Sequence, residues 1–522
     1  MKPTATGSRA PLDSEQPHNG RDEQPIEHFD VLIVGAGLSG IGAACHLKAR
    51  CPGKTFAILE ARDAIGGTWD LFRYPGIRSD SDMFTLGYSF RPWEEAKAIA
   101  DGPSIRSYVR ETARDHGVDR EIRFNHRVVS LSWSSQTATW TVEAERTDTG
   151  ETRRMTCGFL FTCTGYYRYE EGYTPEFAGV DRFRGEIVHP QKWPDDLDYE
   201  GKRVVVIGSG ATAVTLVPAM APSAAHVTML QRSPSYVLSL PARDPIADFL
   251  RRVLPPKLAY AVVRWKNVLL TSAFFYLSRR WPKLIKAAIR RGVQRRLPEG
   301  CDVDTHFKPA YNPWDQRVCL VPDGDLFVSL SRGEASIVTD RIETFTETGL
   351  ELESGAALEA DVIVTATGLN LLPLGGLDIT VDGQRIDISK TVGYKGMMIS
   401  DVPNLALALG YTNASWTLKC DLVAEYVCRL LNRMDAGGYQ QCIPRGPDPS
   451  LPTEPFIDFN SGYVVRSIDK MPRQGQRPPW RLHQNYARDV LLMRYRSVDD
   501  EAMEFAHAGT VAPAVAVITA AA

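Results

Sequence analysis

Two glycine-rich stretches have residue types and spacings suited to binding a dinucleotide. In the first, Gly35, Gly37 and Gly40 form G-x-G-x-x-G directly after an apolar run, and Glu60 ends the next apolar run. Such glycines permit a tight turn and a close approach of the backbone to a pyrophosphate, whose charge the following helix N-terminus stabilises. A carboxylate at the position of Glu60 accepts hydrogen bonds from ribose hydroxyls. The spacing therefore predicts a dinucleotide site.

The second stretch repeats this layout with a different ending. It reads Gly208, Ser209, Gly210, Ala211, Thr212, Ala213, a G-x-G-x-x-A form. The strand expected after it ends in Arg232 and Ser233 instead of an acid. A guanidinium there pairs with a 2′-phosphate, which favours NADP(H) over NAD. The alternative is that Arg232 is a solvated surface arginine. Together the two stretches imply FAD at the first site and NADPH at the second.

The cysteines bear on where the electrons go next. All nine are scattered through the chain without a C-x-x-C pair, so the sequence predicts no metal centre and no redox dithiol beside a flavin. Dioxygen is therefore the expected electron acceptor. The cysteines indicate buried thiols in a reducing cytoplasm, and neither a signal peptide nor an apolar run long enough to span a membrane is visible.

The elements that must position these groups are two βαβ units. The apolar runs 29–34 and 203–207 precede the glycine turns, and helices rich in small residues follow them. Continuous apolar strands of this kind are typical of parallel sheets buried on both faces. The sequence predicts an α/β protein with two doubly wound, Rossmann-like domains. Two more apolar runs, 159–165 and 362–368, each end in Thr-Gly, and we expect each to close a sheet.

Length and composition agree with a large globular protein. The 522 residues suggest about three domains, and 43% hydrophobic with 24% charged residues is ordinary for such a chain. A net charge of -3 provides no overall positive field that would attract nucleic acid.

The segment between Phe249 and Pro298 has a different composition. It holds thirteen Lys or Arg and no Asp or Glu, around an apolar centre, and predicts a separate helical subdomain. One interpretation is a lid packed on the active site with its basic flanks in water. The other is shallow attachment to an anionic membrane surface, because a cationic amphipathic helix buries its apolar face there.

The predicted organisation places one domain inside another. We expect a disordered tail at 1–27, a first part of the FAD domain at 28–165, a first part of the NADP domain at 166–240, the helical subdomain at 241–316, the second part of the NADP domain at 317–369, the second part of the FAD domain at 370–510 and a C-terminal tail at 511–522.

Two longer motifs resemble the fingerprints of type I Baeyer–Villiger monooxygenases. GGTWDLFRYPGIRSD, at 66–80, fits [A/G]-G-x-W-x4-[F/Y]-P-[G/M]-x3-D, and FRGEIVHPQKWP, at 183–194, fits F-x-G-x3-H-x3-W-[P/D]. The resemblance runs from about residue 28 to 505. It implies an NADPH- and O2-dependent flavoenzyme that inserts one oxygen atom next to the carbonyl of a small lipophilic ketone, giving an ester or lactone, and that S-oxidises sulfides or thioamides at the same site.

The resemblance also implies roles for individual residues. The implied FAD contacts are Ser39, Glu60, Thr68, Trp69, Asp70, Asp80 and the backbone of Val128. The implied NADP contacts are Arg78, Ser79, Asp80, Ser209, Gly210, Ala211, Thr212, Ala213, Arg232 and Ser233. The second fingerprint, with Phe183, Gly185, His189 and Trp193, is expected to couple the domains, although His189 is also readily explained as a structural hydrogen-bonding histidine.

The implied catalytic group is Arg317, with Asp80 as its carboxylate partner. An independent physical reason favours an arginine, because an oxygenase must hold a fixed cation near the negatively charged activated oxygen. The alternative is that Arg317 pairs with Asp315 on a loop. Two departures from the family pattern occur. Gln316 stands where most members have a lysine that helps to bind the 2′-phosphate, and the turn expected beside the flavin reads GYTNASWT at 410–417.

Two other functions are compatible with parts of this pattern. One is an N- or S-oxygenating flavin monooxygenase without Baeyer–Villiger activity, which the intact second fingerprint disfavours. The other is a non-catalytic flavin-binding protein, whose sign would be the loss of Gly35, Gly37, Asp80 or Arg317, and all four are present.

Overall fold

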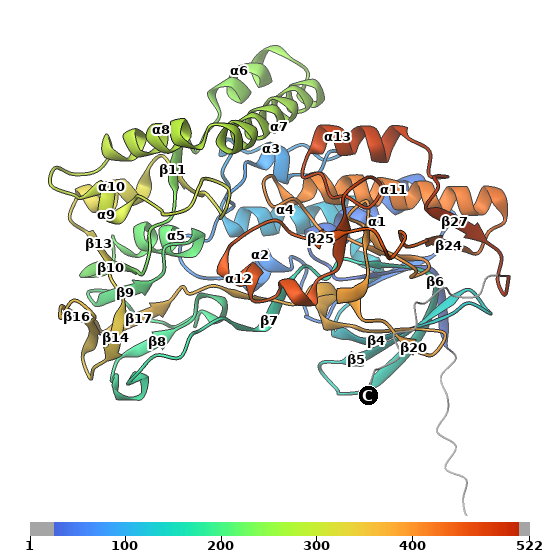
Figure 1. Ribbon diagram of the computed structural model, residues 1–522, viewed down its shortest axis with the longest axis horizontal. Coiled ribbons are helices and arrows are strands. Elements are labelled where there is room, and N and C mark those ends of the chain that lie inside the picture. The colour runs from blue at the N-terminus through green and yellow to red at the C-terminus, as the bar shows by residue number, and fades with distance from the viewer. Residues whose placement is uncertain (1–25, 511–522) are drawn as a thin grey trace, which may run out of the picture.

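The computed structural model describes residues 26–510, which form two sheet-centred lobes side by side with a layer of helices along one edge (Figure 1). The tails expected at 1–27 and 511–522 lie outside the described residues, except that the first strand already begins at Glu27. The fold class predicted from the sequence is confirmed, since both lobes are α/β units built on a glycine turn.

The first lobe is built on a nine-stranded sheet in the order β20-β19-β4-β5-β6-β1-β2-β3, with β23 added beside β6. Its strands are β1 (Glu27–Val34), β2 (Phe56–Leu59), β3 (Ile122–Arg123), β4 (His126–Ser134), β5 (Thr139–Arg146), β6 (Thr152–Thr162), β19 (Asp378–Val381), β20 (Gln384–Arg385) and β23 (Leu405–Leu407). The sheet is mixed, because β5 runs antiparallel to β4 and β6, and β20 runs antiparallel to β19. Their burial alternates along the chain, whereas the last four residues of β1 are all buried.

Helices cover the first sheet and link distant parts of the chain. The main ones are α1 (Leu38–Arg50), α4 (Gly102–Asp115) and α11 (Trp416–Gly437). Helix α1 packs on α11, so the residues after 400 complete the lobe that begins at the N-terminus (Figure 1). The short helix α13 (Tyr486–Val490) and the hairpin of β24 (Gln441–Pro444) with β27 (Met503–Ala506) lie against α11.

The second lobe has a fully parallel five-stranded sheet in the order β13-β10-β9-β17-β8. Its strands are β8 (Glu186–Val188), β9 (Arg203–Ile207), β10 (His226–Gln231), β13 (Ala335–Thr339) and β17 (Val362–Thr365). Helices α5 (Ala211–Met220) and α10 (Asp325–Ser331) belong to this lobe, as does a small antiparallel sheet of β14 (Ile342–Phe345), β15 (Gly349–Leu352) and β16 (Ala357–Glu359).

The two strands that end in Thr-Gly do not close their sheets, contrary to expectation. Strand β6 lies between β5 and β1, and β17 lies between β9 and β8. The four residues of β17 and the last four of β6 are buried. A strand with no polar face needs neighbours on both sides to satisfy its backbone, and this explains the interior positions.

The helical segment leaves the second lobe between β11 (Val237–Leu240) and β12 (Cys319–Pro322), which pair with each other. It forms α6 (Pro245–Val253), α7 (Pro256–Arg280) and α8 (Pro282–Gln294), which run along the upper edge of Figure 1. Not every basic residue of the segment lies in water, because Arg264 is 5% exposed. Its guanidinium donates to the carbonyls of Phe84 and Gly87 at 2.8 and 2.7 Å in the first lobe. Among residues 26–510, no helix is long and apolar enough to cross a bilayer.

Candidate active site

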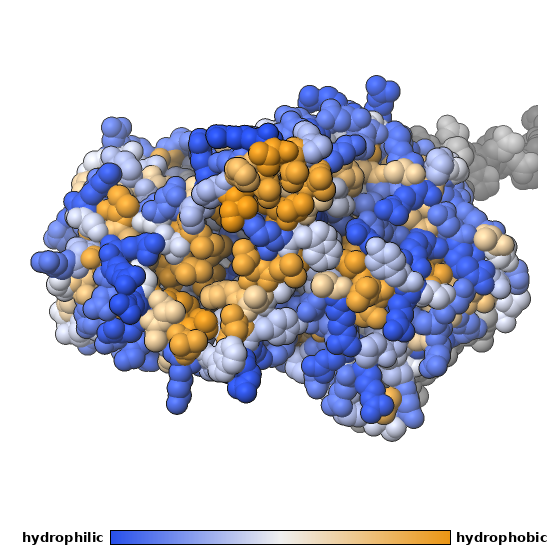
Figure 2. Space-filling view, turned by 90° about the horizontal axis from the view of Figure 1, so that it is seen from above, coloured by the Kyte–Doolittle hydropathy of each residue, from blue (hydrophilic) through white to orange (hydrophobic). Residues whose placement is uncertain are grey.

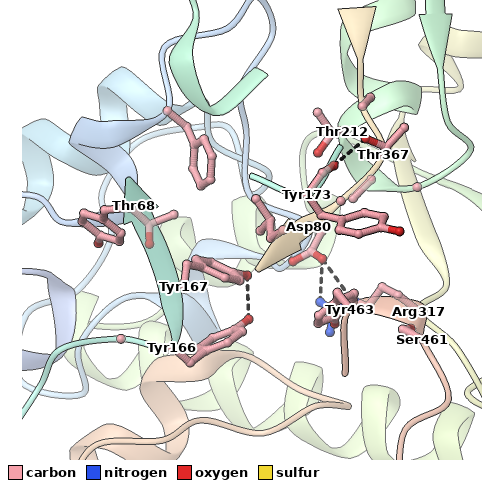
Figure 3. A pocket seen from close by; sticks show the side chains of 18 of the residues that line it. Thr68, Asp80, Tyr166, Tyr167, Tyr173, Thr212, Arg317, Thr367, Ser461 and Tyr463 are labelled. Atoms are coloured by element: carbon pink, nitrogen blue, oxygen red, sulfur yellow. Dashed lines mark hydrogen bonds and ion pairs between the residues drawn. The ribbon is translucent and has the colours of Figure 1, made fainter. Parts of the chain in front are cut away.

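A single large cavity of about 1380 Å³ is lined by residues of both lobes, including both glycine turns (Figure 3 shows part of it). Pockets for one small ligand usually measure about 300 to 1000 Å³. This cavity therefore has room for more than one ligand, as two dinucleotides and a substrate require.

The first glycine turn fits a site where a backbone must approach a ligand closely. Gly35 has φ +105°, and a Cβ there would lie 2.6 Å from the carbonyl oxygen of Cys163. A Cβ on Gly40 would lie 1.8 Å from the carbonyl oxygen of Gly35, so this glycine allows α1 to pack against the turn. Gly37 lines the cavity itself. The arrangement leaves the N-terminus of α1 open to a phosphate group.

Glu60 lies at the end of β2 and faces the same part of the cavity. One carboxylate oxygen accepts from the amide of Ala36 at 2.7 Å and the other from the amide of Arg62 at 2.9 Å. Burial raises the pKa of Glu60, and these two hydrogen bonds oppose that effect. The carboxylate is held in one orientation, with lone pairs left for hydroxyl donors.

The second glycine turn has the same construction. Gly208 has φ +143°, and a Cβ there would lie 2.4 Å from the carbonyl oxygen of Ala366. Cys163 and Ala366 are equivalent residues, since each precedes the Thr-Gly that follows an interior strand of its sheet. The hydroxyl of Ser209 donates to the carbonyl of Ser233 at 2.9 Å and so ties the turn to the end of β10.

Arg232 stands at the cavity rim directly after β10, with Ser233 beside it. Its side chain is exposed and makes no hydrogen bond or ion pair with any other residue between 26 and 510. A guanidinium in that state is available to an anionic ligand. Arg341 and Gln316 line the same cavity.

The first fingerprint connects the two lobes. Thr68 and Trp69, in α2 (Thr68–Leu71), line the cavity on the side of the first lobe. Gly76, with φ +73°, then passes so close to α5 that a Cβ would lie 2.6 Å from that of Ala219. Arg78 forms an ion pair with Asp325 at the start of α10. The fingerprint therefore contacts both lobes, and Arg78, Ser79 and Asp80 all line the cavity.

Asp70 connects two helices of the first lobe. It does not line the cavity and is 1% exposed. Its carboxylate pairs with Arg62 at 2.7 Å, Arg110 at 2.9 Å and Arg106 at 3.4 Å. Because Arg106 and Arg110 belong to α4, the aspartate joins α2 to α4 behind the cavity wall.

Arg317 and Asp80 meet in the cavity, as Figure 3 shows. Nε and Nη2 of Arg317 lie 2.9 and 2.6 Å from Oδ2 of Asp80, and Nη1 donates to the carbonyl of Thr412 at 2.8 Å. Asp315 pairs instead with Arg279, so the alternative pairing of Arg317 with Asp315 does not occur. Burial disfavours the cation and the neighbouring Asp80 favours it, and the pKa of Arg317 is raised.

Aromatic side chains that sequence reasoning missed form the wall around this pair. The rings of Tyr166 and Trp416 stack with centroids 4.7 Å apart, and the hydroxyls of Tyr166 and Tyr167 lie 2.6 Å apart. Tyr463 lies beside Arg317 in Figure 3. The indole of Trp416 donates to the hydroxyl of Ser39 at 3.0 Å. Trp416 belongs to the unusual GYTNASWT stretch, and that departure was the only sequence signal for this wall.

The remaining predicted ligand contacts divide between the cavity and its supports. Those that line it are Ser39, Ser79, Val128, Ser209, Gly210, Ala211, Thr212 and Ser233, whereas Gly40 and Ala213 stand behind the turns. No group of three or more potential metal ligands occurs within residues 26–510.

The second fingerprint lies outside the cavity, in the linker to the second lobe. Nε2 of His189 donates to the carbonyl of Gly368 at 3.2 Å, and Nδ1 accepts from the amide of Gln191 at 3.2 Å. A Cβ on Gly185 would lie 2.3 Å from the carbonyl oxygen of Asp361. Phe183 packs on Phe345, and Trp193 packs on Tyr199. The second fingerprint thus joins the segment that leads from the first lobe into the second to the segment at 365–368 that leads back.

Comparison with known proteins gives consistent results. The family model described as flavin-binding monooxygenase-like matches residues 29–373. The FAD-containing monooxygenase EthA of Mycobacterium tuberculosis strain H37Rv is 57% identical over 481 residues, which is 92% of this chain and 98% of that protein. EthA of Mycolicibacterium smegmatis is 55% identical over 480 residues, or 92% and 97%. A solved oxidized steroid monooxygenase bound to NADP matches with a TM-score of 0.72 at 24% identity, over 92% of this chain and 100% of that one. At that identity the structural match shows the fold.

Proposed function

The chain belongs to the flavin-binding monooxygenase-like family, and from this we propose that it is an FAD- and NADPH-dependent monooxygenase of the Baeyer–Villiger type. The reaction converts a small lipophilic ketone, O2, NADPH and a proton into an ester or lactone, water and NADP+. Oxygen transfer to a sulfide or thioamide follows the same stoichiometry. We place the reaction in the cytoplasm, as the cysteine pattern predicts.

The first glycine turn fits FAD. The open N-terminus of α1 suits the pyrophosphate, and the fixed carboxylate of Glu60 suits the ribose hydroxyls. Thr68, Trp69 and the backbone of Val128 line the same side of the cavity. Bound FAD, once reduced by NADPH, supplies the activation of dioxygen.

The second glycine turn fits NADPH. Arg232 is exposed at the rim, without a partner among residues 26–510, and Ser233 lies next to it. A 2′-phosphate would accept charge-assisted hydrogen bonds from the guanidinium. Gln316 contributes no charge where most of the resembled family has a lysine, so we expect weaker selectivity against NADH than two cations would give.

The observation that carries the proposal is the Arg317–Asp80 pair inside a cavity that both glycine turns line. A hydrogen bond and an ion pair to Asp80, together with a hydrogen bond to Thr412, fix the guanidinium in place. A fixed cation stabilises negative charge that develops on the reacting oxygen atoms without reorganising at the moment of reaction. The aromatic wall of Tyr166, Trp416 and Tyr463 excludes water and accepts an apolar substrate.

Product analysis tests this function directly. The purified protein is incubated with linear, cyclic and aryl ketones and with an aryl sulfide, first with NADPH and then with NADH, and the products are separated by gas chromatography. Ester or lactone formation that requires O2 and prefers NADPH supports the proposal. Sulfoxide without any ester supports the N- or S-oxygenating alternative. A flavin absorbance that fails to bleach on anaerobic addition of NADPH indicates a non-catalytic binding protein.

A further inference from the structure

The exposed apolar side chains of this protein are concentrated on the helical segment. Of the 21 exposed large apolar side chains among residues 26–510, twelve lie on α6, on α7 and at the start of α8. They are Ile246, Phe249, Val253, Leu258, Val262, Trp265, Leu269, Leu270, Tyr276, Leu277, Trp281 and Leu284. Figure 2 looks down on this face and shows apolar groups gathered at its centre with hydrophilic groups around them. We call this set the apolar helix patch.

Five residues of the patch form one continuous stripe on α7. On α7, Leu258, Val262, Trp265, Leu269 and Tyr276 are separated by four, three, four and seven residues, which places them in one stripe. The opposite face of α7 holds the buried Val263, Arg264 and Val268. The stripe is therefore an additional apolar face, because the core-facing side of the helix is already formed by other residues. Contiguous exposed patches of this kind mark interaction sites.

The charges around the patch have one sign. Only four of the thirteen basic residues between Phe249 and Pro298 pair with a carboxylate among the described residues, namely Arg264, Lys266, Arg279 and Arg290. Lys257 stands next to Leu258, and Lys283 and Lys286 flank Leu284. A partner that covers the patch must therefore be apolar at its centre and anionic around it.

We propose that α6, α7 and α8 dock this protein on the surface of an anionic lipid bilayer. The apolar helix patch would enter the boundary between headgroups and acyl chains, and the cations around it would lie against anionic headgroups. Each basic residue near such a surface contributes about 1 kcal/mol of attraction. A second copy of the chain fits less well, because a two-fold contact brings each set of cations against its own equivalent.

The buried side of the docking helix leads to the proposed active site. Phe274 and Phe275 of α7 pack on Trp314, with ring centroids 6.2 and 5.7 Å apart, and Trp314 lies on the loop that carries Arg317. Arg279 pairs with Asp315 on the same loop. Lipophilic substrates that collect in the membrane would thus reach the enzyme beside its cavity. This consequence rests on the proposed function, whereas the docking itself does not.

Vesicle flotation of the full-length flavin-loaded protein tests the docking. We expect it to float with phosphatidylcholine vesicles that contain phosphatidylglycerol and to float much less with phosphatidylcholine alone. The double variant Leu269→Glu/Leu284→Glu should lose flotation, since both side chains are more than half exposed, at 59% and 65%, and their replacement disturbs no core. The matched control is Leu451→Glu, which changes an equally exposed leucine, at 57%, outside the patch and should float like the unaltered protein.

Two lysine variants and a measurement of the oligomeric state complete the test of the docking proposal. Lys283→Gln and Lys286→Gln should each weaken partitioning to anionic vesicles by about fivefold. Unaltered protein that stays with the soluble fraction, or patch variants that float as well as the control, would overturn the proposal. So would a dimer in sedimentation velocity that the Leu269→Glu/Leu284→Glu variant converts to monomer, because the occupant is then a second copy. Turnover of a water-soluble ketone should be the same in all variants, so a failed docking test leaves the enzymatic proposal untouched.

Discussion

At the scale of single residues, the surroundings of Arg317 explain why an arginine suits the position. Its guanidinium donates to Asp80 and Thr412 at the same time, from a rigid planar fork. The side chain remains 28% exposed toward the cavity, so N–H groups are left for a ligand. A lysine would keep the charge and lose this fixed geometry.

Coenzyme selectivity is predicted to depend on Arg232. Replacing it by Gln in Arg232→Gln removes charge-assisted hydrogen bonds to the 2′-phosphate, and such bonds contribute about 1.5 to 3 kcal/mol. We expect the KM for NADPH to rise by roughly tenfold or more, with the KM for NADH nearly unchanged, in steady-state assays that follow NAD(P)H absorbance. An equal rise for both coenzymes would mean that Arg232 acts on something other than the 2′-phosphate.

Local spacing revealed some of these residues and could not reveal others. The glycine turns, Glu60 and Arg232 each follow an apolar strand within a few residues. Residue types at these places have a known role in nucleotide binding, so the sequence predicts their positions directly. Arg317 and Asp80 are 237 residues apart, and only the family resemblance paired them. Tyr166, Trp416 and Tyr463 converge from three distant segments and carry no motif of their own, because stacking requires only an aromatic ring.

At the scale of elements, α7 is predicted to depend on Arg264 for its attachment to the first lobe. Arg264 contacts Asp421 at 3.4 Å and the carbonyls of Phe84 and Gly87, in and directly after the short helix α3 (Met83–Leu86). The variant Arg264→Met leaves these buried acceptors without their partner and should lower the free energy of unfolding by about 3 to 5 kcal/mol. The measurement is chemical denaturation followed by circular dichroism.

A matched control separates burial from charge. Arg290→Met removes the same side chain from the exposed pair with Asp304, whose partners are 43% and 47% exposed, and should change the free energy of unfolding far less. A similar loss in both variants would contradict the assignment of Arg264 as the anchor of α7.

The burial and hydrogen bonds of His189, in the linker, predict that the stability of the folded protein depends on pH. His189 is neutral in its two hydrogen bonds, since Nε2 donates and Nδ1 accepts, and burial lowers its pKa below the usual 6.5. Above that pH, folded and unfolded chains both hold neutral imidazole. As the pH falls below it, the unfolded chain binds the proton first, so the folded state loses stability.

The variant His189→Gln tests this, because glutamine can donate and accept but does not titrate. We expect the urea midpoint of the unaltered protein to fall between about pH 7.5 and about pH 5.5, and to fall less in the variant. His306 and His483, whose pKa values burial also lowers, are present in both proteins and cancel in the comparison. Identical pH dependence in the two proteins would exclude His189 as the source.

The elements also show where sequence patterns were sufficient. Continuous apolar runs predicted the strands next to both glycine turns, since strands buried on two faces have no polar positions. Strands β4 and β5, whose antiparallel pairing makes the first sheet mixed, alternate in burial, and the sequence patterns did not distinguish them from loops. The interior places of β6 and β17 depend on pairings between segments more than a hundred residues apart, which no local pattern reports.

At the scale of the whole molecule, the two lobes are held around one cavity by contacts between distant segments of the chain. Arg78 joins the first fingerprint to α10, and His189 joins the two linkers. This arrangement explains why the motifs of the resembled family lie both inside and outside the cavity. The first fingerprint positions Asp80, and the second fingerprint fixes the linkers between the lobes.

The central claim is that Arg317 directs activated oxygen into the substrate, and the coupling ratio tests it most directly. NADPH consumption and ester formation are measured in one reaction for the unaltered protein, for Arg317→Lys and for Arg317→Ala. We predict close to one ester per NADPH in the unaltered protein and less in Arg317→Lys. In Arg317→Ala, NADPH oxidation should continue while ester disappears and hydrogen peroxide accounts for the electrons. Ester formation by Arg317→Ala at the unaltered ratio would contradict the account.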